Sequence, residues 1–329
     1  MRYLMGPRDR RVRQKPLIHL NPNNFKDDLK KQIKSELTEL LGIQYPIIGA
    51  PMFVVSYEEL TVAVSEAGGL GMFPLPNYRT LDDLETAFKN IRQATDKPIG
   101  VNIHLSGKFP WREQLALCLE YGVTFYITSL GDPSLIIEDV HKSGGLVYAD
   151  VVSAKHGMRA KERGVDGLVA VAAGAGGHGG TIPTMILVPY LRESTGLPVV
   201  AAGGVSTGAQ LAAALCLGAC GAITGTRLLA TPEAGISDAY RQAVIKAEPG
   251  GIVCTDRLTG NRASWIADSI EGIEAGPDIG SRKWKDLWSA GQSVAQTNKI
   301  CSVAEIVQEM ADECLKTLES IFKKQVLEI

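Results

Sequence analysis

Short apolar runs alternate with longer amphipathic segments along most of the chain. Eight runs are predicted as strands: Pro46–Ala50, Gly69–Phe73, Pro98–Ile103, Val123–Thr128, Leu146–Val152, Asp166–Ala172, Pro198–Gly203 and Gly221–Thr226. The segments between them have helical periodicity: Tyr57–Ala67, Leu81–Ala94, Trp111–Tyr121, Ser134–Ser143, Ala154–Arg163, Met185–Thr195 and Gly208–Leu217. Several strands are apolar throughout, which is typical of parallel strands covered on both faces.

A series of eight strand–helix repeats favours a closed (β/α)8 TIM barrel over an open sheet. No proline- or serine-rich linker interrupts the series. We therefore predict one α/β barrel domain over residues 46–234. Residues 1–45 are predicted to form an N-terminal extension that includes a helix over Phe25–Leu41. Residues 235–329 are predicted to form a largely helical C-terminal region that covers the barrel mouth.

Charge and hydropathy narrow the range of partners. The net charge of −2 argues against nucleic acid as a partner. No apolar run reaches the roughly 18 residues that a membrane-spanning helix needs. The N-terminus lacks the apolar core of a secretory peptide and is instead basic between Arg2 and Lys15. We expect this arm to be solvated or to pack on a second subunit of a homodimer.

The cysteines show neither a disulfide framework nor a zinc motif. Six are scattered along the chain without an accompanying histidine pattern: Cys118, Cys216, Cys220, Cys254, Cys301 and Cys314. We expect reduced thiols, a cytoplasmic location and no metal site.

Glycine pairs end the last two predicted strands. The seventh strand ends in Gly203-Gly204, and the eighth ends in Gly225-Thr226. In TIM barrels the loops after these two strands often form a phosphate site. Glycine lets backbone N–H groups approach phosphate oxygens, and a threonine hydroxyl adds a donor. The two pairs therefore predict a site for a phosphorylated cofactor.

A glycine-rich loop with one histidine follows the sixth strand, over Gly174–Thr181. It matches the dinucleotide pattern G-x-G-x-x-G, but Glu193, the acidic residue at the required spacing, lies within a predicted helix instead of at a strand end. We reject the dinucleotide interpretation. His178 lies at the C-terminal end of a barrel strand, which favours a catalytic role over that of a neutral loop histidine.

Two further segments are expected to line the mouth. Ala50, Pro51 and Met52 follow the first strand and suit the face of an aromatic ring system, whereas the amide of Asn102 in the third strand suits its polar edge. Either segment could instead belong to the core. His104 could also reach the mouth.

With these segments in place, the chain resembles the nitronate monooxygenase family, formerly called 2-nitropropane dioxygenases. The matching pieces are YPIIGAPM at 45–52, AGGLGM at 67–72, GVN at 100–102, GGHG at 176–179, AAGG at 201–204 and Gly225–Thr226. The resemblance implies an FMN-dependent barrel that oxidises alkyl nitronates with dioxygen. It implies FMN contacts from Asn102, Gly176, Gly204 and the segment Ile223–Thr226, with His178 beside the substrate.

Combined with the reasoning from the residues, the resemblance gives a full set of predicted site residues. The catalytic residue is His178, and the cofactor-binding residues are Ala50, Pro51, Met52, Asn102, Gly176, Gly177, Gly203, Gly204, Ile223, Thr224, Gly225 and Thr226. The expected partners are a small-molecule substrate and dioxygen. Well-known members carry glutamine and glutamate where this chain has Val171 and Gly174, which indicates a divergent branch.

Relatives with the same barrel supply an alternative function. Type II enoyl-acyl-carrier-protein reductases and quinone reductases share the glycine–histidine loop and FMN but take hydride from NAD(P)H. The chain shows no second phosphate loop, and its Phe53–Val55 loop is apolar, which favours a small closed pocket over a dinucleotide groove. Inosine monophosphate dehydrogenase is excluded, because no cysteine lies between Cys118 and Cys216. A flavin-binding protein without turnover is a third interpretation.

Overall fold

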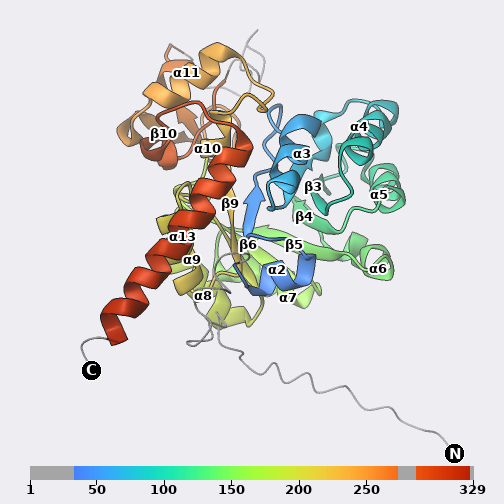
Figure 1. Ribbon diagram of the computed structural model, residues 1–329. Coiled ribbons are helices and arrows are strands. Elements are labelled where there is room, and N and C mark those ends of the chain that lie inside the picture. The colour runs from blue at the N-terminus through green and yellow to red at the C-terminus, as the bar shows by residue number, and fades with distance from the viewer. Residues whose placement is uncertain (1–32, 273–286, 327–329) are drawn as a thin grey trace, which may run out of the picture.

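The computed structural model describes residues 33–272 and 287–326 (Figure 1). Its strands are β1 (Ile47–Gly49), β2 (Gly71–Pro74), β3 (Ile99–His104), β4 (Phe125–Ser129), β5 (Leu146–Val151), β6 (Gly167–Val171), β7 (Gly177–His178), β8 (Val199–Ala202), β9 (Gly221–Thr224), β10 (Ile252–Thr255) and β11 (Ala263–Ile266). Its α-helices are α2 (Glu36–Leu41), α3 (Glu58–Glu66), α4 (Leu81–Ala94), α5 (Trp111–Glu120), α6 (Ser134–Lys142), α7 (Ala154–Glu162), α8 (Thr184–Thr195), α9 (Gly208–Cys216), α10 (Thr226–Leu229), α11 (Asp238–Lys246), α12 (Ala267–Ile270) and α13 (Val303–Val326). Short 3-10 turns cover Leu75–Asn77, Pro249–Gly251 and Gln292–Gln296.

Eight strands form a parallel barrel in the order β1-β9-β8-β6-β5-β4-β3-β2. A parallel bridge between Ile48 and Leu70 joins β1 to the segment before β2 and closes the ring. The hydrogen bonds from Gly49 N to Leu70 O and from Leu70 N to Ile47 O are both 2.9 Å long. The predicted (β/α)8 fold is confirmed, and each predicted strand and each helix between strands overlaps an observed one.

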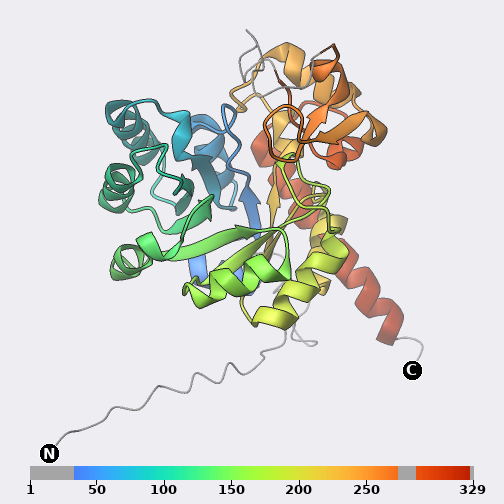
Figure 2. The same cartoon turned by 180° about the vertical axis from the view of Figure 1, so that it is seen from behind.

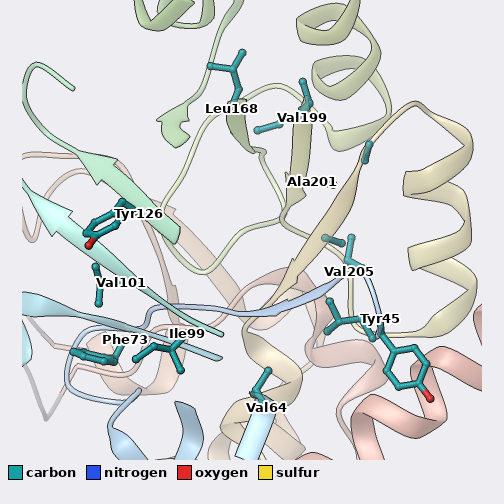
Figure 3. Packing of buried hydrophobic residues seen from close by; sticks show 14 of the residues in the cluster. Tyr45, Val64, Phe73, Ile99, Val101, Tyr126, Leu168, Val199, Ala201 and Val205 are labelled. Carbon is teal, nitrogen blue, oxygen red and sulfur yellow. The ribbon is translucent and has the colours of Figure 1, made fainter. Parts of the chain in front are cut away.

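The barrel strands are buried on both faces, which explains their continuous apolar runs. Alternate residues fill the barrel interior, among them Ile48, Met72 and Tyr148. The remaining positions belong to a second cluster that also contains the buried faces of the surrounding helices, and Figure 3 shows Phe73 and Val101 among its members. The core therefore has two layers, one inside the strands and one outside them.

Helix α2 closes the end of the barrel at which the strands begin. Leu37 is fully buried and packs with the interior residues of the strands. Ser35 and Thr38 form a capping box that starts the helix, and Ser35 itself has an extended backbone. The prediction of one continuous helix over Phe25–Leu41 is therefore wrong at Ser35, because α2 begins only at Glu36. Its first residues, like the basic arm, lie outside the described residues.

Helix α13 is the eighth helix of the barrel wall, although it lies at the end of the chain. It packs against α9 and α3, so it lies beside the barrel and does not cover the mouth (Figure 1). A Cβ atom on Gly208 of α9 would lie 2.2 Å from Met310 O, so the two helices touch through their backbones. The barrel therefore does not end at residue 234 as predicted, because the apolar face of α13 belongs to the barrel core.

The segment between α10 and α13 forms a cap over the end at which the strands finish (Figure 2). It contains α11 and α12 but also an antiparallel pair, β10 and β11, that the prediction of a largely helical region missed. Strand β7, which follows the sixth barrel strand, pairs with β11. The predicted eighth strand also ends earlier than expected, since Thr226 begins α10.

No helix among the described residues is long and apolar enough to cross a membrane.

Candidate active site

Gly203-Gly204 after β8 and Gly225-Thr226 after β9 form a cradle under the cap, with open space beside Gly204. Gly203 and Gly204 have φ angles of +114° and +77°, which side chains rarely adopt. A Cβ atom on Gly204 would meet no atom within 4 Å. The N–H groups of Gly204 and Gly225 donate to no described residue. Unused donors beside open space fit a phosphate group, as the sequence predicted.

Thr226 joins this cradle to the cap. Its Oγ1 accepts a hydrogen bond of 2.9 Å from Gly291 N, which leaves the hydroxyl hydrogen available to a ligand. The neighbouring Thr224 is buried, and its hydroxyl donates to Val205 O at 3.2 Å. The side chain of Thr224 therefore points away from the mouth, whereas Ile223 packs with the barrel interior.

The segment after β1 lies directly beside the cradle. Ala50 N donates to Thr224 O at 2.9 Å. The Sδ atom of Met52 would be 3.5 Å from a Cβ atom on Gly225. Ala50, Pro51 and Met52 are all half-buried. The structure thus brings the first and last barrel strands together around the predicted cofactor site.

A chain of hydrogen bonds crosses the mouth from β3 to β5. Asn102 Nδ2 donates to Ser129 Oγ at 2.8 Å and to Ile127 O at 3.2 Å. Ser129 Oγ donates to Asp150 Oδ2 at 2.5 Å. Both amide hydrogens of Asn102 are used, so its Oδ1 atom is left to accept a bond from a ligand. This arrangement fits the predicted role of Asn102 at the polar edge of a ring.

Asp150 is a site residue that the sequence analysis missed. Asp150 is accessible to solvent at the end of β5, yet the surrounding protein desolvates its carboxyl. This desolvation raises the pKa of Asp150 to about 6, and the hydrogen bond from Ser129 opposes the rise. The signal in the sequence is a single acidic residue within the apolar run Leu146–Val151. A carboxyl group with a pKa near 6 can exchange protons near neutral pH.

His178 reaches the mouth on β7. Its backbone pairs with Ala263 of the cap, and its Nε2 atom lies 3.4 Å from Thr259 Oγ1. The side chain contacts solvent, but partial burial lowers the pKa of His178 from its usual value. The imidazole is therefore neutral at pH 7.

His104 faces the same part of the mouth from the end of β3. Burial, Lys108 and His178, in that order, lower the pKa of His104. Its Nδ1 atom lies 2.9 Å from Ser106 Oγ, and its ring meets Phe109 edge to face. The site thus contains two neutral imidazoles and one carboxyl group.

The glycines around His178 allow close backbone packing against the cap. A Cβ atom on Gly176 would lie 2.9 Å from Ala290 C, and one on Gly291 would lie 2.4 Å from Gly174 O. Gly177 N donates to Ser289 Oγ at 2.6 Å. This packing alone requires glycine at 176 and 291, so contacts of Gly176 and Gly177 with a cofactor stay a prediction.

Fold and site together define a (β/α)8-barrel enzyme with a glycine cradle at the ends of its last two strands. The family model described as nitronate monooxygenase matches residues 34–110 and 104–275. The chain belongs to the nitronate monooxygenase family and is an oxidoreductase. The family predicted from the sequence is confirmed.

Two relatives illustrate the range of this similarity. The chain is 34% identical to (3aS,4S,5R,7aS)-5-hydroxy-7a-methyl-1-oxo-octahydro-1H-indene-4-carboxyl-CoA dehydrogenase of Mycobacterium tuberculosis, over 74% of this chain and 70% of that protein. It is 31% identical to nitronate monooxygenase of Paraburkholderia phytofirmans, over 74% of this chain and 79% of that protein.

Two solved structures share the fold. FabK from Thermotoga maritima has a TM-score of 0.78 and 29% identity, over 89% of this chain and 100% of that one. Nitroalkane oxidase from Streptomyces ansochromogenes has a TM-score of 0.75 and 25% identity, over 87% of this chain and 100% of that one.

Proposed function

We propose that the protein is an FMN-dependent oxidoreductase that oxidises alkyl nitronates, or the nitroalkanes from which they form, with dioxygen. The observation that carries this proposal is a neutral His178 held at the mouth of a barrel whose last strands end in a glycine cradle that would fit a phosphate. Similarity to a nitronate monooxygenase and a nitroalkane oxidase supports it. A cytoplasmic location and a small-molecule substrate are parts of the same proposal.

The described residues fit FMN. The N–H groups of Gly204 and Gly225 and the hydroxyl of Thr226 would bind the phosphate. Asn102 would accept a hydrogen bond from the ring edge, and Met52 would contact a ring face. When bound, FMN supplies the acceptor for the electrons of the substrate.

His178 would act on the substrate. A neutral imidazole has one N–H donor and one acceptor nitrogen. The donor can hold a nitro oxygen, on which negative charge lies in a nitronate. The cap fixes the position of this imidazole, because β11 pairs with the backbone of His178.

A second candidate function is oxidation or reduction of a carbon next to a thioester. The relative at 34% identity, whose name is that of a carboxyl-CoA dehydrogenase, favours it. Of the two NAD(P)H-dependent reductases that the sequence offers as alternatives, the enoyl type acts on such a carbon, whereas the quinone type does not.

Flavin spectroscopy tests these candidates. The purified protein should bind one FMN per chain, and anaerobic mixing in a stopped-flow instrument should show reduction by a nitroalkane or its nitronate. NADH and NADPH should reduce the flavin slowly or not at all. Fast reduction by NAD(P)H without a response to nitro compounds would favour the reductase. A protein that ignores added FMN would refute the whole proposal.

A further inference from the structure

The Asp150 carboxylate at the barrel mouth bears on whether the substrate binds as a neutral molecule or as an anion. We propose that the Asp150 carboxylate is the base that removes a proton from carbon of a neutral nitroalkane. The enzyme would accordingly act on the neutral compound in preference to the preformed nitronate anion. This inference rests on the proposed function and specifies its substrate.

The position of Asp150 in β5 places its carboxyl at the mouth. Tyr148, two residues earlier and on the same face of the strand, packs in the barrel interior. Asp150 therefore lies on the inner face near the open end, where its side chain is accessible. Ser129 donates to Oδ2, and no described residue donates to Oδ1. One carboxyl oxygen is held, and the other is available to a substrate.

No charged group among the described residues acts on the Asp150 carboxyl, because only burial and the Ser129 hydrogen bond shift its pKa. Ser129, which donates to Asp150, and Asn102, which donates to Ser129, are neutral. The titratable groups of the mouth, His104 and His178, are neutral at pH 7 because their pKa values are lowered.

Helix α7, which follows β5, carries the basic residues Lys155, His156 and Arg159, and Arg163 is its C-cap. His156, Arg159 and Arg163 line one hollow with Asp150, but none of these basic residues contributes to the shift in its pKa. No nearby cation therefore offsets the charge of the carboxylate when a ligand meets it. Coulomb repulsion penalises an anion placed beside it, whereas a neutral nitroalkane carries no such penalty.

The proton transfer is balanced without a further reactant. The bond between the α-carbon and hydrogen breaks, and the proton moves to an oxygen of Asp150. The electron pair stays on the substrate, which becomes the nitronate within the site. The proposed function then supplies the electron acceptor and dioxygen for its oxidation.

Two measurements on the FMN-loaded protein test the base. In anaerobic D2O, proton NMR should show exchange of the α-hydrogens of nitroethane faster with enzyme than without it. Asp150→Asn should reduce this exchange, and kcat/KM for neutral nitroethane, by at least a hundredfold. The same variant should raise kcat/KM for ethyl nitronate, since the repelling charge is gone. The matched control is Asp139→Asn on α6, which makes the same change on an exposed outer helix.

The outcomes separate the two proposals. Oxidation of ethyl nitronate without oxidation of nitroethane would overturn the role of Asp150 and leave the proposed function standing. Equal losses on both forms in Asp150→Asn, with unchanged flavin content, would also overturn it and make Asp150 a positioning residue. Binding of FMN without oxidation of either form would overturn both proposals.

Discussion

Placing a carboxylate at Gly204 tests the phosphate cradle directly. A Cβ atom there would enter space in which no atom lies within 4 Å, so an aspartate side chain fits without a clash. At about 5 Å from a phosphate, and with an effective dielectric constant near 20, each pair of unit charges repels by about 3 kcal/mol. Gly204→Asp should therefore weaken FMN binding by a factor of more than about 100.

The matched control is Gly204→Asn, which has nearly the same shape and no charge. Both variants place a side chain at a φ of +77°, and asparagine and aspartate tolerate this region better than other residues. The two variants should therefore have equal melting temperatures, and only the charge distinguishes their FMN affinities.

The assay is titration of the flavin-free protein with FMN, followed by the fluorescence of the flavin. Gly204→Asn should bind FMN about 100 times more tightly than Gly204→Asp, because the two side chains fill the same space and only aspartate adds a charge. If the two variants bind FMN within a factor of three of each other, the phosphate does not lie at Gly204. The reasoning from open space and unused donors would then be refuted.

Three further predictions concern the substrate site, the helix packing and the desolvated carboxyl of Asp150. His178→Ala should still bind FMN, but its turnover should fall at least tenfold, which corresponds to a barrier higher by about 1.4 kcal/mol. Unchanged turnover would show that His178 is a structural residue. Gly208→Ala should lower the free energy of unfolding by about 2 kcal/mol, because its Cβ atom would lie 2.2 Å from Met310 O. The control Gly250→Ala places its Cβ atom in open space and should leave the free energy of unfolding unchanged. Equal melting curves for the two variants would contradict this prediction. The pKa of Asp150 is about 6 in the folded protein, whereas its ordinary value is 3.8. The folded state therefore binds the carboxyl proton more tightly than the unfolded state, and the protein loses stability as the pH rises from about 4 through 6. Asp150→Asn should thus be more stable at pH 8, by about 1 kcal/mol after allowance for solvent screening, and no more stable at pH 4; calorimetry at both pH values checks it.

The barrel could be predicted because its strands leave a local signal. Strands such as β8 are buried on both faces, so they appear as short apolar runs. The runs are separated by helices whose burial repeats with the helical period, as in α4. The glycine pair at 203–204 was informative for a related reason, since its positive φ angles need glycine.

The cap and the last helix could not be predicted, because they depend on contacts between distant segments. Strand β7 contains two residues and pairs with β11, about eighty positions later, so no periodicity marks it. Helix α13 has an amphipathic pattern that identifies a helix but not the surface it packs on. Its place beside α9 follows from the backbone contact at Gly208, which only the folded chain shows.

The role of Asp150 is partly predictable, because its place in the sequence pattern of β5, combined with the barrel fold, would have located it at the mouth. Alternate residues of a barrel strand face inward, and Tyr148 fills the interior. The next inward position, one step nearer the open end, is Asp150. An acidic residue at an inward position has no outer surface on which its charge could be solvated, so it must be satisfied within the mouth. Ser129 and Asn102, at the ends of the two preceding strands, provide that hydrogen-bonded chain. A polar residue at the last inward position of a barrel strand is therefore evidence for the site, even where the strand is otherwise apolar.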